Sequence, residues 1–165
     1  MNRGPFLRRA VMLVLCAFGL LGLLSGGVHA NSAPVLDNAG TMTLTGINED
    51  NYTSTGTTIA ALIASAIGNR IADIDAGAIE GIAVIAVDNT NGAWQFSTNG
   101  GTNWSNFGTP TTAAARLLGA DSNNNKVRFV PGLNFNGTVD PGITFHAWDQ
   151  ATGANGNTAD ISGGG

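Results

Sequence analysis

Short runs in which polar and apolar residues alternate recur along the chain, separated by clusters of Gly, Asn and Asp. Three such runs are Thr41 to Ile47, Ala93 to Ser97 and Ile143 to Trp148. Alternation with a period of two places one set of side chains on each face of a half-buried β-strand. The pattern therefore predicts three strands, and the run from Lys126 to Val130 predicts a fourth.

The segment from Gly81 to Val87 is apolar almost throughout, which is typical of a central strand. The polar residues from Asp88 to Gly92 join it to the next predicted strand, as a hairpin turn does. Short strands separated by Gly- and Asn-rich turns predict an all-β fold of the sandwich type.

Two segments predict helix instead of strand. Apolar residues recur at helical spacing between Thr57 and Ile67, so we expect a short helical insertion there, and one helical turn from Ala113 to Leu118. After Trp148 the chain reads ATGANGNTADISGGG, without a further apolar strand. The last strand of the sandwich is therefore expected to be missing. Either the chain continues beyond this sequence or a partner strand completes the open sheet edge.

Residues 1–30 have the pattern of a secretory signal peptide. Arg3, Arg8 and Arg9 precede an apolar run that ends at Leu24, and Val28-His29-Ala30 has the small residues of a cleavage site. The run of about 15 residues is shorter than the roughly 20 that a membrane-spanning helix needs. We expect a secreted or cell-surface protein, with an uncleaved membrane anchor as the alternative.

The remaining chain divides into a linker at residues 31–40, marked by Ala33-Pro34, and one domain at residues 41–165. Of the seven basic residues three lie in the signal segment, so four basic residues face all eleven acidic ones and the net charge is −7. Such a surface repels nucleic acid and attracts cations. The single cysteine, Cys16, lies in the signal segment, so disulfides do not stabilise the domain.

Acidic residues at predicted loop positions are candidate calcium ligands. Asp73 and Asp75 are two residues apart in a loop before Gly77, and Glu49-Asp50 and Asp149 follow predicted strands. Calcium takes six to eight oxygen ligands in flexible geometry. We do not expect Glu49 and Asp73 to share one ion. The alternative is that these residues are solvated turn acids, since Asp is common in turns.

Several motifs in this order resemble the bacterial cadherin-like repeats of large secreted adhesins. The motifs are Asn31-Ser-Ala-Pro-Val, Ile47-Asn-Glu-Asp50, Ala72-Asp-Ile-Asp-Ala-Gly77, Phe129-Val-Pro-Gly-Leu-Asn-Phe-Asn-Gly137 and Ile143-Thr-Phe-His-Ala-Trp-Asp149. The resemblance implies an immunoglobulin/cadherin-like β-sandwich that binds Ca²⁺ and serves as an adhesion or stalk module. Its partners would be neighbouring repeats or a homotypic surface. The chain departs from the family pattern in having one copy and no D-x-N-D-N linker.

The chain is poor in catalytic groups, and we expect no enzyme activity. His146 is the only histidine after the signal segment, and no serine in a nucleophile-elbow context accompanies it. Ser97 to Trp104 matches S-x-(D/N)-x-G-x-x-W, which predicts a hairpin turn with Trp104 packed over it. Trp94 and Trp148 are interpreted as core residues. A carbohydrate-binding module with stacked tryptophans, or an inert structural repeat, are the alternative functions.

Overall fold

The computed structural model describes residues 30–68 and 70–163. The signal peptide predicted at residues 1–30 therefore lies outside the described residues apart from Ala30, and it stays a prediction. Within the described ranges, no helix has the length and apolar composition that crossing a membrane requires.

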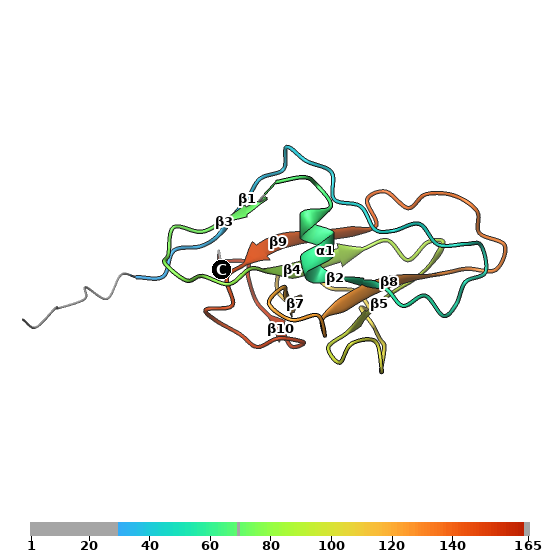
Figure 1. Ribbon diagram of the computed structural model, residues 1–165. Helices are drawn as coiled ribbons and strands as arrows, with labels where there is room; N and C mark the ends of the chain where they lie inside the picture. The colour runs from blue at the N-terminus through green and yellow to red at the C-terminus, as the bar shows by residue number, and fades with distance from the viewer. Residues whose placement is uncertain (1–29, 69, 164–165) are drawn as a thin grey trace, which may run out of the picture.

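The chain folds into two antiparallel four-stranded sheets, as Figure 1 shows. The first sheet consists, in spatial order, of β10 (Thr158–Ala159), β7 (Ala115–Gly119), β4 (Gly81–Val87) and β9 (Ile143–Trp148). The second consists of β2 (Thr57–Thr58), β8 (Lys126–Pro131), β5 (Gly92–Ser97) and β6 (Ser105–Asn106). A separate pair is formed by β1 (Val35–Leu36) and β3 (Ile71–Ala72). The predicted all-β sandwich is confirmed.

The main core lies between the two sheets and takes side chains from both. Ile82 and Val84 of β4 pack in one cluster with Trp94 of β5 and Val127 of β8. The apolar sequence of β4 follows from burial on both of its faces, because Ile82 and Val84 lie in the main core while Ala83 is buried in a second cluster with Leu117 and Trp148.

The one helix among the described residues, α1 (Ile59–Ala64), covers one side of this core. The Thr58 hydroxyl caps it by accepting a hydrogen bond from the Ala61 amide, at 3.1 Å. The helical spacing places Ile59, Leu62 and Ile63 on the buried face. The predicted helical insertion is confirmed, although the helix is shorter than residues 57–67.

The helical turn predicted at Ala113 to Leu118 is wrong, because Ala115–Gly119 form strand β7. This strand lies between β10 and β4 and is buried on both faces, so its apolar side chains do not alternate with polar ones. A short continuous apolar run does not distinguish a buried strand from a helix.

The expectation that no strand follows Trp148 is also wrong. Residues Thr158 and Ala159 form β10, which pairs with Arg116 and Ala115 of β7. The strand is held by backbone hydrogen bonds, including Leu117 N to Asn157 O at 3.0 Å. Two residues with little apolar surface leave no hydrophobic pattern to detect. The first sheet still ends at β9, which pairs only with β4 within the described part of the chain.

Two N-terminal segments differ from their predictions. The range 31–40, interpreted as a linker, contains β1, which pairs with β3, and Asp37, which forms a 2.6 Å ion pair with Arg70. Thr41 to Ile47, predicted as a strand, belongs to none of the sheets. Met42 and Leu44 are half-buried while Thr41 and Thr43 are exposed, so burial alternates as in a strand. The segment nevertheless pairs with none of the described strands.

Candidate functional site

The sheet topology brings three segments together at one end of the molecule. Asp73 and Asp75 directly follow β3, and Asp149 directly follows β9. Because Trp148 of β9 pairs with Gly81 of β4, the end of β9 lies beside the loop that leads from Asp73 into β4. The pairing of β1 with β3 places the N-terminal residues next to the same loop.

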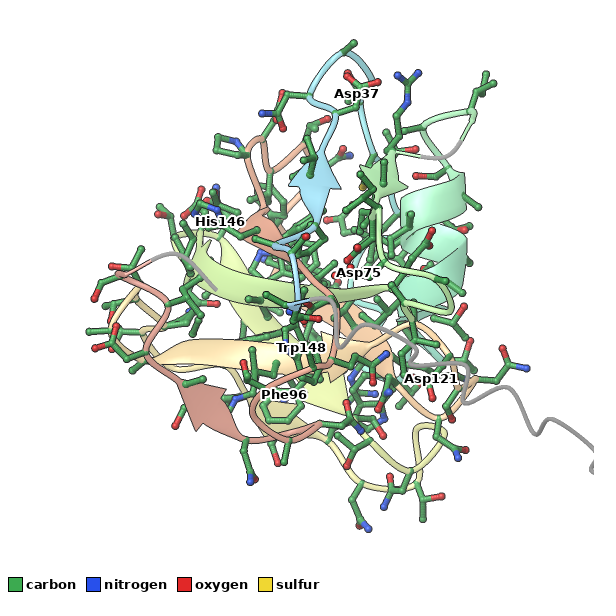
Figure 2. All side chains as sticks on the ribbon, turned by 90° about the vertical axis from the view of Figure 1, so that its left-hand side faces the viewer. Asp37, Asp75, Phe96, Asp121, His146 and Trp148 are labelled. Atoms are coloured by element: carbon green, nitrogen blue, oxygen red, sulfur yellow. The ribbon has the colours of Figure 1, made fainter. Side chains whose placement is uncertain are left out.

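These segments line one small acidic pocket of about 160 Å³. Its carboxylate side chains are Asp73, Asp75, Glu80 and Asp149, and no lysine or arginine lines it. Figure 2 looks onto this end of the molecule, with Asp75 and Trp148 both facing the viewer. We call this site the acidic pocket.

Backbone and amide donors hold three of these carboxylates in place. The Asp75 amide donates to Asp73 Oδ1 at 2.8 Å, and the Ser32 amide donates to Asp75 Oδ2 at 2.6 Å. Asn31 Nδ2 donates to Asp149 Oδ2 at 2.7 Å, and Asp149 Oδ1 accepts from the Ala151 amide at 2.9 Å. Asn31 and Ser32 therefore form hydrogen bonds both to the loop after β3 and to the residue after β9.

One oxygen of the acidic pocket has no donor. Asp73 Oδ2 is buried and has no hydrogen-bond partner in the structure. A buried carboxylate oxygen without a donor or cation carries an uncompensated desolvation cost. The residues present therefore suit a cation bound against Asp73.

The carboxylates do not form a complete metal site by themselves. Within residues 30–68 and 70–163, no group of three or more His, Cys, Asp or Glu side chains is arranged to hold an ion. Calcium, however, also takes backbone carbonyl, amide and water oxygens, and tolerates irregular geometry. The acidic pocket can supply such a mixed set through the backbone of the loop from Asp73 to Glu80, which lines it.

The other two predicted ligands, Glu49 and Asp50, lie away from the acidic pocket. Asp50 Oδ1 accepts from the Tyr52 hydroxyl at 2.8 Å and from the Asn134 amide at 3.1 Å. The hydrogen bond to Asp50 raises the pKa of the Tyr52 hydroxyl. Glu49 lines a different and larger groove. The five predicted ligands thus fall into two groups, and the structure brings together only Asp73, Asp75 and Asp149.

Sequence reasoning did not assign Asn31, Ser32 and Glu80 to the site. Asn31 and Ser32 belong to the opening motif that carried the family resemblance, which could have indicated them. Glu80 precedes β4 without any motif around it, and only the three-dimensional structure places it in the pocket.

The structure also shows the surroundings of the predicted hairpin turn, of the tryptophans and of His146. Ser97 Oγ donates to Asn99 Oδ1 at 2.9 Å, which ties the predicted hairpin turn, and the Arg128 guanidinium lies 4.2 Å from the ring centroid of Trp104. Trp94 and Trp148 are buried, which confirms their interpretation as core residues. His146 is exposed on β9.

Comparison with protein-family models, with curated proteins and with solved structures finds no match for this chain. The resemblance to cadherin-like repeats therefore stays a prediction, and the functional argument rests on the geometry of the acidic pocket.

Proposed function

We propose that the chain is a calcium-stabilised, non-catalytic adhesion or stalk module of the cadherin-like type, exported by its signal peptide. The observation that supports this function is the buried, unpartnered Asp73 Oδ2 in a pocket lined by four carboxylates and no basic side chain. A divalent ion offsets both the missing hydrogen bond and the repulsion between the carboxylates.

The proposed calcium ligands are the carboxylates of Asp73, Asp75 and Asp149, which line one pocket but have to move closer together to reach one ion, since three carboxylates are not already arranged around an ion in the described residues. Backbone carbonyls of the loop that lines the pocket, together with water, would complete the ligand set, and Asn31 would orient Asp149 through its hydrogen bond. Glu49 and Asp50 are left out of this set because they border the larger groove or bind neighbouring backbone. The bound ion would hold the N-terminal segment, the loop after β3 and the end of β9 in one arrangement.

Exposed apolar side chains beside the acidic pocket favour a role in contact with another module. Ile74 lies between the two loop aspartates and is 87% exposed, and Val35 in β1 is 66% exposed. An exposed apolar rim around a charged site is typical of an interaction surface. In the proposed function a neighbouring repeat or a homotypic surface partner covers this rim.

The burial of two tryptophans disfavours the carbohydrate-binding alternative. Trp94 and Trp148 are only 5% and 6% exposed, so of the three tryptophans that could form a stacking platform only Trp104 is partly accessible.

Thermal unfolding of the chain from Asn31 onward, in calcium and in chelator, tests the proposal. A calcium Kd of roughly 0.1 to 1 mM, typical of extracellular modules, stabilises the fold by ~1.4 to 2.7 kcal/mol at about 10 mM calcium. We expect the Tm to rise by several degrees in wild type, and the rise to disappear in Asp73→Ala/Asp75→Ala. The matched control Glu49→Gln/Asp50→Asn should keep the full rise. An identical wild-type Tm in calcium and in excess chelator would reject the proposal.

A further inference from the structure

The edge strand β9 and the segment at residues 41–47 both have backbone groups without partners. β9 pairs with β4 on one side and with no strand on the other, within the described part of the chain. To the other described residues, residues 41–47 make no backbone–backbone hydrogen bond, and the only amide among them with a partner there is Thr43 N, which donates to Ser65 Oγ at 2.9 Å. Two stretches of extended chain therefore present free hydrogen-bonding groups.

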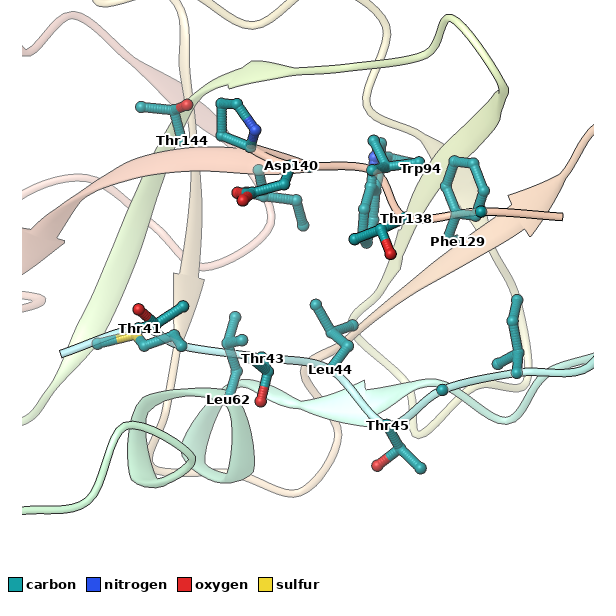
Figure 3. Close-up of a pocket in the computed structure, with 18 of the residues that line it drawn as sticks. Thr41, Thr43, Leu44, Thr45, Leu62, Trp94, Phe129, Thr138, Asp140 and Thr144 are labelled. Carbon is teal, nitrogen blue, oxygen red and sulfur yellow. The ribbon is translucent and has the colours of Figure 1, made fainter. Parts of the chain in front are cut away.

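A groove of about 940 Å³ separates the two stretches. Figure 3 shows residues 41–45 along one wall and Thr138, Asp140 and Thr144 along the other. Leu44 and Leu62 point into the groove, whereas Thr43 and Thr45 point away from it. We call this feature the strand groove.

The interior of the strand groove is apolar and partly aromatic. Its lining includes Leu44, Leu62, Trp94, Phe129 and Phe145. Trp94 Nε1 is buried and donates to no acceptor in the structure. Apolar side chains that enter the groove from an occupant would be removed from water there, which favours binding.

The rim of the strand groove is negatively charged. Asp37, Glu49 and Asp140 are among its lining residues, and none of the lining residues is lysine or arginine. Asp37 is paired with Arg70, whereas Glu49 and Asp140 form no ion pair with a described residue. Charge complementarity therefore favours an occupant with basic residues.

We propose that the strand groove binds an extended peptide segment that alternates apolar and polar residues and carries lysine or arginine. The segment adds to the open edge of β9 by backbone hydrogen bonds, and its apolar side chains enter the groove. A strand of about 5 to 6 residues, roughly 17 to 20 Å long, is the usual length for such an addition. On its other side the added strand meets the free backbone groups of residues 41–47.

This inference does not rest on the proposed calcium site. The strand groove is lined by Ile143 to Phe145 at the start of β9, whereas Asp149, which follows the end of β9, lines the acidic pocket. Peptide binding is therefore expected to persist in chelator. An experiment can therefore disprove calcium binding without disproving peptide binding, and the reverse.

Fluorescence anisotropy with three labelled octapeptides tests the inference on the chain from Asn31 onward. The first probe has three Val-Thr repeats between two lysines. The second has the same composition with the valines in one block, and the third has glutamate in place of both lysines. We expect saturable binding of the first probe, with a Kd below about 100 µM, and at least tenfold weaker binding of the other two.

Variants of the chain locate the binding. Glu49→Lys and Asp140→Lys should each weaken binding of the lysine-flanked peptide about three- to tenfold and improve binding of the glutamate-flanked one. The control Asp160→Lys makes the same charge change next to β10, at the opposite edge of the first sheet, and should leave both affinities unchanged. Equal binding of the blocked and alternating peptides would overturn the inference. Displacement of the peptide by a neutral oligosaccharide, or by self-association of the chain, would also overturn it.

Discussion

At the residue scale, Asp73 is the side chain on which the metal argument depends. Its Oδ1 accepts a hydrogen bond from the Asp75 amide, while its Oδ2 is buried without a donor. In the proposed site, Asp73 would therefore oppose folding when no cation is bound and would be a ligand when one is. Removing the Asp73 charge is therefore expected to change the stability in opposite directions in chelator and in calcium.

Asp73→Asn is expected to be more stable than wild type in chelator and less stable than wild type in calcium. The asparagine keeps the oxygen that accepts from Asp75 but removes the buried charge, so the variant should be more stable than wild type in chelator by about 1 kcal/mol. In calcium it should be less stable, because it has lost a ligand. Urea unfolding in both conditions measures the two differences. A variant that is less stable than wild type in both conditions would contradict the account.

The sequence predicted part of the acidic pocket for a physical reason. Asp73 and Asp75 lie two residues apart in one loop, so local spacing was enough to group them. The meeting of Asp149 with this loop depends on the register of β9 against β4, which no local pattern encodes. Glu49 and Asp50 look equally suitable in the sequence, yet the fold places them away from the acidic pocket.

At the element scale, the strands that were predicted correctly are those with a distinctive hydrophobic pattern. β5 and β9 alternate, and β4 is apolar over a length typical of a central strand. β7 has buried apolar side chains on both faces, and its sequence predicts a helical turn instead of a strand. Residues 41–47 have the alternating pattern of a strand but pair with no other strand among the described residues. Alternation shows that one face of the segment is buried, and it does not show whether the backbone is hydrogen-bonded to a neighbouring strand.

Close packing between β4 and β9 predicts a specific sensitivity at Gly81. A Cβ atom on Gly81 would lie 2.8 Å from a ring carbon of Trp148 and 3.1 Å from the Leu118 carbonyl oxygen. We expect Gly81→Ala to destabilise the chain by about 2 kcal/mol, because overpacking a buried strand forces its neighbours apart. Denaturant unfolding gives the value.

Gly46→Ala is the matched control for this substitution, since a Cβ atom there meets nothing within 4 Å. Its unfolding free energy should stay within about 0.5 kcal/mol of wild type. Equal effects of the two substitutions would show that β4 and β9 do not pack as described.

At the scale of the whole molecule, the C-terminal segment closes one side of the first sheet. Gly156 N donates to Leu117 O at 2.8 Å, and Ile161 N donates to Thr112 O at 2.8 Å. The Asn155 side chain accepts from Gly119 N at 3.0 Å and donates to buried Asn125 at 2.9 Å. A segment that reads as structureless in the sequence is therefore part of the fold.

Removal of the chain from Ala154 onward is expected to cost about 3 kcal/mol or more, since several hydrogen bonds are lost and β7 becomes an edge strand. Urea unfolding measures the loss, and amide hydrogen exchange at Leu117 should become faster. A truncated chain with an unchanged urea midpoint would show that β10 does not contribute to stability.

The calcium claim is tested most directly by isothermal titration calorimetry of the metal-free chain from Asn31 onward. The account predicts one saturable calcium site with a Kd of roughly 0.1 to 1 mM, present in Glu49→Gln and absent in Asp73→Asn. Wild-type protein that gives only the heat of dilution up to several millimolar calcium, or binding that survives the loss of Asp73, would contradict it.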